Sequence, residues 1–250
     1  MRLEFIAIFS QNRMYRKNNC MSIYTDGDYF VRNPTWHEEH SSWKAKHIVK
    51  IIRDNNITAK NIAEIGCGMG QILVELASRM PEVEQFSGFE ISPQAFARAR
   101  EKATERIGYA NVDILADPPR HLYDIAMAID VFEHVDDYIG FIRGMARVCK
   151  YKLFHIPLEM TATSVVRPRA LAYAREHVGH IHYFTRETAL ATLEHAGLKI
   201  IDERFTDLAI DNAVSPREKL AAFPRCVLGA INKKIAARLV GGFSLLVLAE

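Results

Sequence analysis

The sequence lacks the features that mark disulfide-stabilised, zinc-finger and membrane-spanning proteins. It contains four cysteines in 250 residues, and no two of them have the CxxC spacing of a metal finger or redox motif. An apolar stretch at residues 3–9 is too short to span a bilayer and includes an acid. No small-residue cleavage site follows it, so we expect no signal peptide. These absences favour a protein of the reducing cytoplasm with free thiols and no integral membrane contact.

Charge of one sign is not in excess either. The 32 Lys and Arg residues nearly balance the 30 Asp and Glu residues, and the net charge is +2 at pH 7. The whole-molecule charge therefore does not indicate a nucleic-acid partner, and a small-molecule substrate is the simpler expectation. With 49% hydrophobic residues the chain can bury one substantial core, so we expect a single domain over residues 1–250.

The most informative stretch is residues 61–70, where an apolar run passes into a turn with glycine at every second position. The glycines are Gly66, Gly68 and Gly70, and apolar residues recur at helical spacing beyond them. Glycine leaves no Cβ between the backbone and a ligand, and a helix start leaves free N–H groups facing the turn. The pattern predicts a strand, a ligand-binding turn and a helix, which together begin a βαβ unit.

Two acidic residues narrow the choice of ligand. Glu64 precedes the first glycine, and Glu90 closes the next apolar run. A carboxylate at the end of the second strand is placed to accept hydrogen bonds from both ribose hydroxyls, and it would repel a 2′-phosphate. The GxGxG spacing also differs from the GxGxxG of dinucleotide sites. S-adenosylmethionine fits these features, because it has a free ribose and no pyrophosphate.

Three segments resemble the class I S-adenosylmethionine-dependent methyltransferases in order and spacing. They are EIGCGMG at 64–70, GFEIS at 88–92 and DVFEHV at 130–135. The resemblance implies an α/β, doubly wound, Rossmann-like sheet of seven strands, mostly parallel, with the last strand antiparallel between the fifth and the sixth. It also implies S-adenosyl-L-methionine as the cofactor. The likeness is to the small-molecule enzymes, and the ubiquinone-pathway O-methyltransferases in particular.

Apolar periodicity and turn residues give each expected element its bounds. Strands are expected at 61–65, 84–90, 112–115, 123–129, 152–156, 198–204 and 243–249. Helices are expected at 35–55, 70–80, 93–107, 137–148 and 186–196, with a helical insertion between Pro216 and Leu239 before the last strand. Residues 1–58 then form an N-terminal extension and helix, 59–158 the cofactor-binding core, and 159–250 the substrate-shaping elements with the last two strands.

The residues expected to hold the cofactor lie at the carboxyl edge of the sheet, where doubly wound sheets bind ligands. They are Glu64, Gly66, Cys67, Gly68, Gly70, Glu90, Ile91, Asp117 and Asp130. In the resembled family an acid after the third strand accepts the adenine amino group, and Asp117 matches it. The alternative is that Asp117 only opens the turn at Pro118 and Pro119.

Histidines near the same edge are candidate bases. Methyl transfer to a hydroxyl needs an aligned acceptor and removal of a proton. His134 is the first candidate, because it follows the fourth strand and imidazole titrates near neutral pH. The alternative is that the pair Glu133-His134 has a structural role at a helix start. His182 and Tyr183 are rival catalytic candidates, and His180 is a candidate contact with the acceptor.

Two further residues are candidate substrate contacts. Trp36 lies in the loop that, in the resembled family, covers the cofactor; alternatively it anchors the following helix to the core. Arg167 lies near two other arginines, and their forked donors could bind a phosphate or carboxylate. The alternative is a solvated basic face. The basic helix between Pro216 and Leu239 either covers the core or meets an anionic membrane or an acidic partner.

A divalent metal is left open by the sequence. Asp130, Glu133 and His134 are hard donors around one turn, and a similar run is linked to a divalent ion in the ubiquinone-pathway enzymes that this segment resembles. Here the first acid is Asp rather than Glu, which shortens its reach. We assign no metal ligand on this basis.

The sequence therefore predicts a cytoplasmic enzyme that transfers a methyl group from S-adenosyl-L-methionine to an oxygen, or a nitrogen, of a small polar metabolite. A sugar or a secondary metabolite is expected as the acceptor, and its anionic character is left open. One alternative is an RNA or protein methyltransferase. Another is a non-catalytic S-adenosylmethionine-binding partner subunit. A homodimer is left open.

Overall fold

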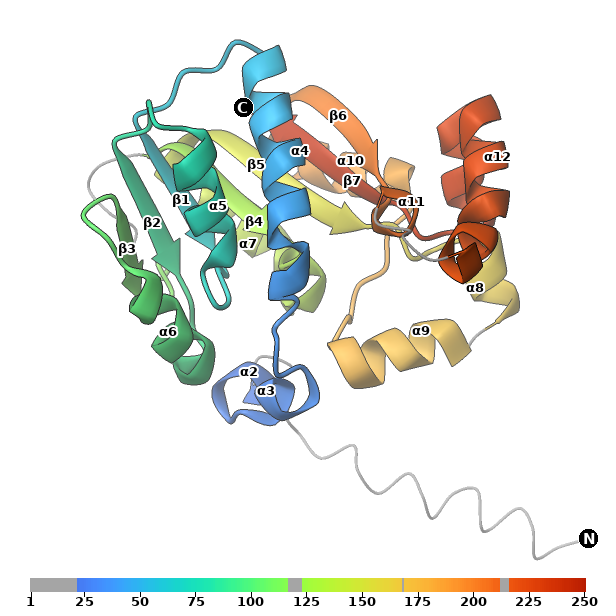
Figure 1. Cartoon of the computed structure of the whole chain (residues 1–250), viewed down its shortest axis with the longest axis horizontal. Coiled ribbons are helices and arrows are strands. Elements are labelled where there is room, and N and C mark those ends of the chain that lie inside the picture. The colour runs from blue at the N-terminus through green and yellow to red at the C-terminus, as the bar shows by residue number, and fades with distance from the viewer. Residues whose placement is uncertain (1–21, 117–122, 168, 212–215) are drawn as a thin grey trace, which may run out of the picture.

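A seven-stranded sheet in the order β3-β2-β1-β4-β5-β7-β6 lies at the centre of the molecule (Figure 1). The computed structural model describes residues 22–116, 123–167, 169–211 and 216–250. The strands are β1 (Asn61–Ile65), β2 (Gln85–Phe89), β3 (Ile107–Ala110), β4 (Tyr123–Ile129), β5 (Cys149–Pro157), β6 (Ile200–Thr206) and β7 (Ser244–Ala249). Strand β7 pairs antiparallel with both β5 and β6, and the remaining pairs are parallel. The predicted sheet, with its last strand reversed between the fifth and the sixth, is confirmed.

Helices cover both faces of this sheet (Figure 1). The α-helices are α2 (Ser22–Thr25), α3 (Asp28–Arg32), α4 (Ser41–Asp54), α5 (Gln71–Arg79), α6 (Pro93–Ala99), α7 (Tyr138–Val148), α8 (Ala162–Val166), α9 (Arg169–Tyr173), α10 (Arg186–His195), α11 (Leu208–Asp211) and α12 (Pro216–Leu239). Shorter turns of helix are η2 (Glu38–His40), η3 (Arg100–Lys102), η4 (Phe132–His134) and η5 (Ala174–Val178). The side chains of Ser92, Asp137 and Thr185 cap α6, α7 and α10, since each accepts a hydrogen bond from the third backbone N–H of its helix.

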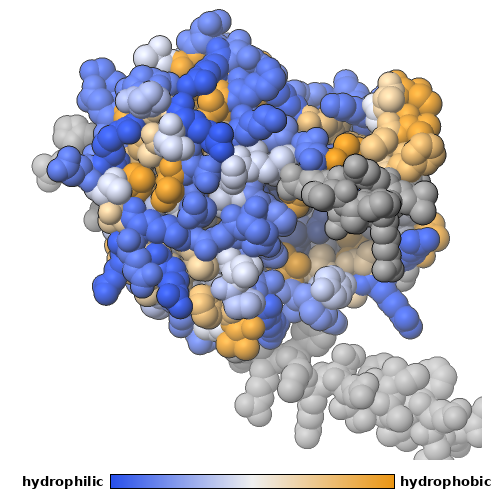
Figure 2. Space-filling view, in the orientation of Figure 1, coloured by the Kyte–Doolittle hydropathy of each residue, from blue (hydrophilic) through white to orange (hydrophobic). Residues whose placement is uncertain are grey.

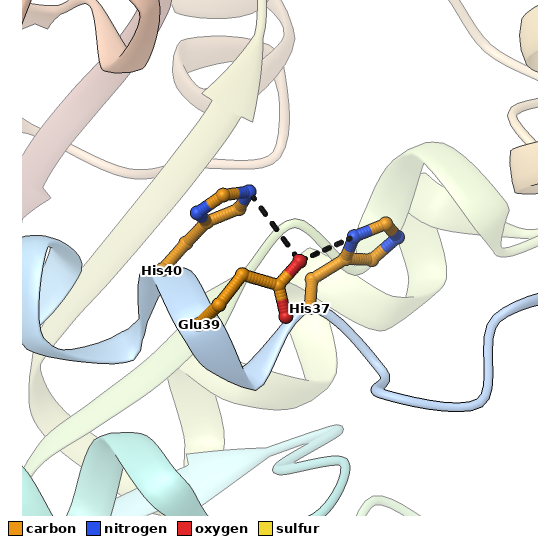
Figure 3. A group of neighbouring side chains, drawn as sticks. All are labelled: His37, Glu39 and His40. Carbon is orange, nitrogen blue, oxygen red and sulfur yellow. Dashed lines mark ion pairs between the residues drawn. The ribbon is translucent and has the colours of Figure 1, made fainter. Parts of the chain in front are cut away.

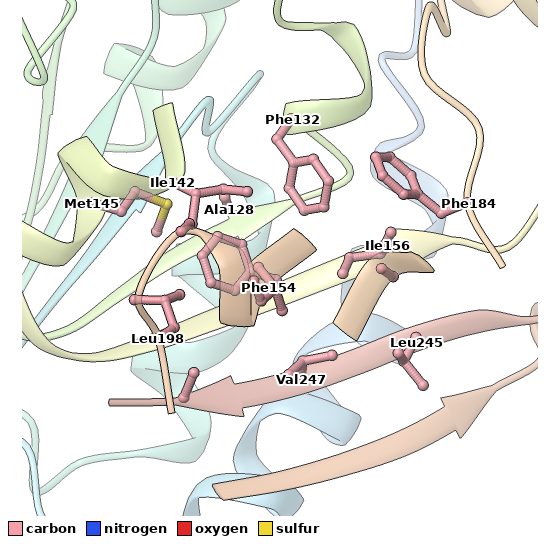
Figure 4. Packing of buried hydrophobic residues seen from close by; sticks show 14 of the residues in the cluster. Ala128, Phe132, Ile142, Met145, Phe154, Ile156, Phe184, Leu198, Leu245 and Val247 are labelled. Atoms are coloured by element: carbon pink, nitrogen blue, oxygen red, sulfur yellow. The ribbon is translucent and has the colours of Figure 1, made fainter. Parts of the chain in front are cut away.

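Two hydrophobic clusters hold the layers together. Alternate residues of β4 face opposite sides: Ala126 and Ala128 join one cluster, whereas Ile125 and Met127 join the other. The first cluster contains side chains of α7 and α10, and the second contains those of α4 and α5. Figure 4 shows the first cluster, in which aromatic rings from η4, β5 and the chain before α10 pack over β7. Packing on both faces fixes the strands whose carboxyl ends carry the glycine turn.

The third strand departs from the prediction. It spans Ile107–Ala110 rather than 112–115, and the preceding helix ends at Ala99 instead of reaching 107. Residues 107–110 pair with β2, and the chain then leaves the sheet. Ile114 and Leu115 have the apolar character of a strand but line a cavity, which explains the error. The predicted bounds of the other strands are correct to within three residues, and α12 has the expected ends with a kink at Asn232.

Helix α12 packs on the core through small residues and exposes large ones. Ala236 and Ala237 are buried in the first cluster. Large apolar side chains one turn apart are 43–78% exposed along the same helix; they are Phe223, Val227, Ile231, Ile235 and Leu239. Figure 2 shows this apolar surface over α12 at the upper right. The helix therefore covers the core, as one of the two sequence interpretations expected. In the part of the chain that the structure describes, every helix is too short or too polar to cross a bilayer.

Candidate functional site

Two neighbouring cavities lie along the carboxyl ends of the central strands. The first, here called the cofactor cavity, has a volume of about 350 Å³ and is lined by residues from the ends of β1, β2 and β4. The second, here called the histidine-rich cavity, has a volume of about 270 Å³ and includes the glycine turn. Their shared lining residues are Tyr29, Trp36, Gly66, Asp130 and His134. Four of the residues predicted for the site thus lie where the two cavities adjoin, namely Trp36, Gly66, Asp130 and His134.

The glycine turn requires glycine for two reasons. Gly66, Gly68 and Gly70 have φ values of +72°, +54° and +79°, which side-chain-bearing residues rarely adopt. A Cβ on Gly66 would lie 2.8 Å from the Val131 side chain, and one on Gly68 would lie 2.6 Å from the Trp36 ring. The turn can therefore keep its shape and its closeness to the cavities only without side chains.

Glu90 connects the glycine turn to the next helix. Its Oε2 accepts a hydrogen bond from the backbone N–H of Gly68 at 2.8 Å, and its Oε1 accepts one from Ser92 N–H at 2.8 Å. Burial raises the pKa of this carboxyl, although the backbone donors oppose that shift. Each carboxylate oxygen has a further lone pair, so Glu90 can still accept from a diol. Glu90 and Ile91 both line the cofactor cavity, as the sequence predicted.

The acid predicted for the adenine falls outside the described residues. Asp117 belongs to residues 117–122, whereas Asp113 lines the cofactor cavity. Because β3 ends at Ala110, Asp113 is the acid that follows the strand in the part of the chain that is described. The sequence interpretation did not consider Asp113, because it placed the strand too late. The run Ile107–Ala110, followed by a polar residue, was the signal that could have found it.

Glu64 and Lys44 are an acidic and a basic residue that both line the histidine-rich cavity. Glu64 is buried, and its Oε2 has no hydrogen-bond partner among the described residues. Burial raises the pKa of Glu64 to about 8, and nearby Lys44 acts in the opposite direction. Lys44 was missed in the sequence, although it lies three residues after Ser41 and four before Ile48, on the buried face of α4.

Asp130 has a strained backbone conformation, and its carboxylate has two side-chain partners. Its φ is +55°, and its Oδ2 lies 2.7 Å from Lys44 Nζ. Its Oδ1 lies 2.6 Å from His155 Nδ1, and the other ring nitrogen of His155 lies 2.9 Å from the Thr206 hydroxyl. Burial alone would raise the pKa of Asp130, but His155 and Lys44 outweigh it and hold the pKa below its ordinary value. Asp130 is thus engaged by protein groups, and a metal set of Asp130, Glu133 and His134 is not formed.

A different group of donors converges beside Asp130. Ligand atoms of Glu133, His134 and His180 lie within 4.8 Å of one another. Burial raises the pKa of Glu133 to about 8, and its two carboxyl oxygens have no hydrogen-bond partner among the described residues. An orphaned buried carboxyl beside two imidazoles fits a divalent cation. We call these three residues the Glu133 cluster.

The two histidines of this cluster have opposite electrostatic environments. Burial and the neighbouring His180 lower the pKa of His134 to about 3, and Tyr24 Oη lies 2.7 Å from its Nδ1. Burial also acts to lower the pKa of His180, but a 2.7 Å contact between its Nδ1 and Glu159 Oε2, with the charges of Glu133 and Asp130, raises it overall. His180 is therefore the stronger base of the two.

Three predicted site residues lie away from these two cavities. His182 Nε2 lies 3.0 Å from the Val135 carbonyl oxygen, and the Tyr183 hydroxyl donates to the Leu171 carbonyl at 3.0 Å. Neither His182 nor Tyr183 lines the cofactor cavity or the histidine-rich cavity. Arg167 lines a third cavity of about 390 Å³ between α8 and the loop before β7. The structure thus does not bring these three side chains to the point where the first two cavities meet.

Trp36 occupies the position that the sequence predicted for it. It lines both cavities, and its ring centroid is 4.7 Å from that of Tyr29. Tyr24 adds a third ring, 4.8 Å from Tyr29. Trp36 therefore lies over Gly68, and Tyr29 and Tyr24 pack in a row behind its ring.

Comparison with known proteins agrees with this geometry. A family model described as a methyltransferase domain matches residues 36–203, so the chain belongs to that family. The ubiquinone biosynthesis O-methyltransferase of Nitrosospira multiformis is 25% identical over 126 residues, which cover 46% of this chain and 52% of that protein. The norajmaline N-methyltransferase of Rauvolfia serpentina is 31% identical over 112 residues, 42% of this chain and 37% of that one. The chain therefore spans about half the length, or less, of the curated relatives that it matches.

Solved structures show the same fold. The magnesium protoporphyrin IX methyltransferase of Synechocystis, crystallised with S-adenosylhomocysteine, aligns with a TM-score of 0.56 at 15% identity and covers 83% of this chain and 82% of its own. The class I S-adenosylmethionine-dependent methyltransferase resemblance predicted from three short segments is thereby confirmed.

Proposed function

We propose that the protein binds S-adenosyl-L-methionine and transfers its methyl group to an oxygen of a small polar metabolite. The observation that carries this proposal is the position of Glu90, whose carboxylate is tied to the Gly68 N–H and still faces the cofactor cavity. A buried carboxylate there suits a ribose diol and opposes a 2′-phosphate. The nitrogen of an acceptor is the second choice of methylated atom.

The cofactor is divided between the two cavities in this proposal. Its nucleoside lies in the cofactor cavity, with Glu90 on the ribose and Asp113 on the adenine amino group. Its amino-acid end lies along the glycine turn, where Lys44 complements the carboxylate and Glu64 the ammonium group. The methyl group is then presented near Asp130, which lines both cavities. In-line transfer needs the acceptor on the far side of that point, within the histidine-rich cavity.

His180 is our candidate for the base that takes the acceptor proton. It lines the histidine-rich cavity and is oriented by Glu159, which also raises its pKa towards the range useful at neutral pH. His134, the first candidate from sequence, has the lowered pKa of a weaker base. Its place where the cavities meet suits contact with the acceptor instead.

The Glu133 cluster would hold a divalent cation if the enzyme uses one, and His180 would then be a ligand of that ion instead of the base. Such an ion supplies Lewis-acid chemistry, which orients an acceptor hydroxyl and lowers its pKa. The chain would then hold the buried carboxyl group of Glu133 next to the imidazoles of His134 and His180, so that all three can bind the same ion.

The test combines binding and transfer. Calorimetry should show S-adenosylhomocysteine binding to the wild-type protein, and radiolabelled S-adenosylmethionine should label a fraction of the small polar metabolites. Parallel reactions with a chelator decide whether a metal is needed. Label that enters only RNA or protein would support the macromolecular alternative, whereas binding without any transfer would support a non-catalytic subunit. No binding at all would refute the proposal.

A further inference from the structure

A second set of metal-ligating side chains lies at the edge of the histidine-rich cavity, separate from the Glu133 cluster. His37, Glu39 and His40 come from the loop and the short helix η2 that precede α4. Their ligand atoms lie within 4.8 Å of one another, and Figure 3 shows both imidazole rings on either side of the same Glu39 oxygen. We propose that these three residues bind a zinc-class divalent cation at the mouth of the cavity.

The spacing of the donor atoms favours a shared ion over direct pairing. His37 Nδ1 lies 3.9 Å from Glu39 Oε1, and His40 Nε2 lies 3.7 Å from the same oxygen. Both distances exceed those of a hydrogen bond. Around a tetrahedral zinc with bonds of about 2.0–2.2 Å, neighbouring donor atoms lie roughly 3.3–3.5 Å apart. Each imidazole therefore needs to approach Glu39 by only about half an ångström to share one ion with it, and the ligand atoms of the two histidines lie within 4.8 Å of each other.

The donor types select the class of ion. Imidazole nitrogen suits zinc and related transition metals, whereas calcium and magnesium prefer sites made of oxygen alone. Two imidazoles and one carboxylate provide three ligands, so at least one position is left for water or for an oxygen of the acceptor. The side chains are 43%, 50% and 31% exposed, which lets an ion reach them from solvent.

The backbone holds these donors at the cavity rather than in free solvent. Trp36 and His37 have φ values of +47° and +59°, a conformation that residues with side chains rarely adopt and that clusters at ligand sites. The Trp36 ring is fixed against Tyr29, and both His37 and His40 line the histidine-rich cavity. An ion held by this set would therefore sit beside the space proposed for the acceptor.

Metal titration of the full-length protein tests the proposal without knowledge of the acceptor. The protein is stripped with a chelator and titrated with Co²⁺, whose visible absorption reports ligation by nitrogen and oxygen, and then with Zn²⁺ in competition. We expect His37→Ala, Glu39→Gln and His40→Ala each to weaken binding by roughly tenfold or more. Glu38→Gln is the matched control, because this neighbouring carboxylate pairs with Lys102 instead; its affinity should equal that of the wild type.

Glu133→Gln separates the proposed site from the buried cluster. We expect it to leave the Co²⁺ spectrum of the surface site in place. Thermal unfolding of each variant confirms that it is folded at the titration temperature. The proposal is overturned by an absence of stoichiometric binding, by equal affinity in the wild type and the three ligand variants, or by a spectrum that is lost only in Glu133→Gln. None of these outcomes bears on whether the protein binds S-adenosylmethionine.

Discussion

The cofactor half and the acceptor half of the site are assembled in different ways. The cofactor half uses residues that directly follow neighbouring strands, namely Gly66 after β1, Glu90 after β2 and Asp130 after β4. The proposed acceptor half joins segments distant in sequence, since His134 after β4 contacts Tyr24 of α2 and His180 pairs with Glu159. Parallel strands bring their carboxyl ends to one edge whatever the loops do. The cofactor half therefore depends on the sheet, and the acceptor half depends on how loops pack over it.

If the halves are separate, loss of the base should affect turnover alone. We expect His180→Ala to reduce kcat by about a hundredfold, the usual contribution of a general base, with cofactor affinity unchanged. Steady-state kinetics on the identified acceptor, together with calorimetry, measure the two effects. His134→Ala is the comparison. If it reduces kcat by more than His180→Ala and abolishes the pH dependence, the base is His134 and our assignment is wrong.

The converse change should affect cofactor binding alone. Glu90→Ala removes the group proposed to hold the ribose, and we expect S-adenosylmethionine to bind about 1–3 kcal/mol more weakly, as for other buried polar partners. Calorimetry checks this. Because Glu90 also accepts hydrogen bonds from the Gly68 and Ser92 N–H groups, the thermal stability of Glu90→Ala should be measured alongside its affinity. Unchanged affinity in a folded Glu90→Ala protein would remove Glu90 from the cofactor site.

Glu64, which lines the histidine-rich cavity but is proposed to bind the cofactor, should make the stability of the protein depend on pH. The pKa of Glu64 is about 8 in the folded protein against an ordinary value of 4.5, so the folded state holds this proton more tightly. Its contribution is complete below pH 4.5 and is lost as the pH rises through 8. We expect the free energy of unfolding to fall by about 4–5 kcal/mol over that window.

Urea unfolding of the wild type and Glu64→Gln, without cofactor, isolates this effect. The variant should lose less stability between pH 5 and pH 8, because its amide does not titrate. Equal pH dependence in the two proteins would mean that Lys44 keeps Glu64 ionised, and that the two form a buried ion pair instead.

The smallest expected effect concerns the adenine. We expect Asp113→Ala to weaken S-adenosylmethionine binding by about 1 kcal/mol, the net value of one hydrogen bond, while S-adenosylmethionine binding to Asp117→Ala stays at the wild-type level. Calorimetry on the two variants compares them directly. A larger loss of affinity in Asp117→Ala than in Asp113→Ala would support Asp117, the residue assigned from the sequence.

Much of the cofactor half could be predicted from the sequence. The turn at Gly66, Gly68 and Gly70 and the acid at Glu90 were identified from spacing, because glycine needs and strand ends are local properties. Asp113 was missed, since Ile114 and Leu115 have the apolar character of a strand and face a cavity instead. Apolar residues line ligand sites as well as cores, so periodicity alone could not place the end of β3.

The acceptor half was predicted less well. His180 was recognised as a contact, but His182 and Tyr183, two and three residues away, lie outside the first two cavities. The direction of each side chain in this segment depends on long-range contacts, such as the hydrogen bonds from Ile181 and His182 N–H to the Glu133 carbonyl. Lys44, which is proposed for the cofactor, could be predicted only in part. The helical period places it on the buried face of α4, but the sequence does not identify Asp130 as its partner.

By itself the sequence determined the order of the elements, the shape of the glycine turn and the family, because these follow from periodicity, chirality and residues adjacent in the chain. Only the tertiary structure decided which imidazole is the stronger base and which carboxylates stay protonated. Those properties depend on burial and on charges that approach from distant segments. The pKa of His134 is lowered by burial and by the neighbouring His180, whereas the pKa of His180 is raised by its hydrogen-bond partner Glu159.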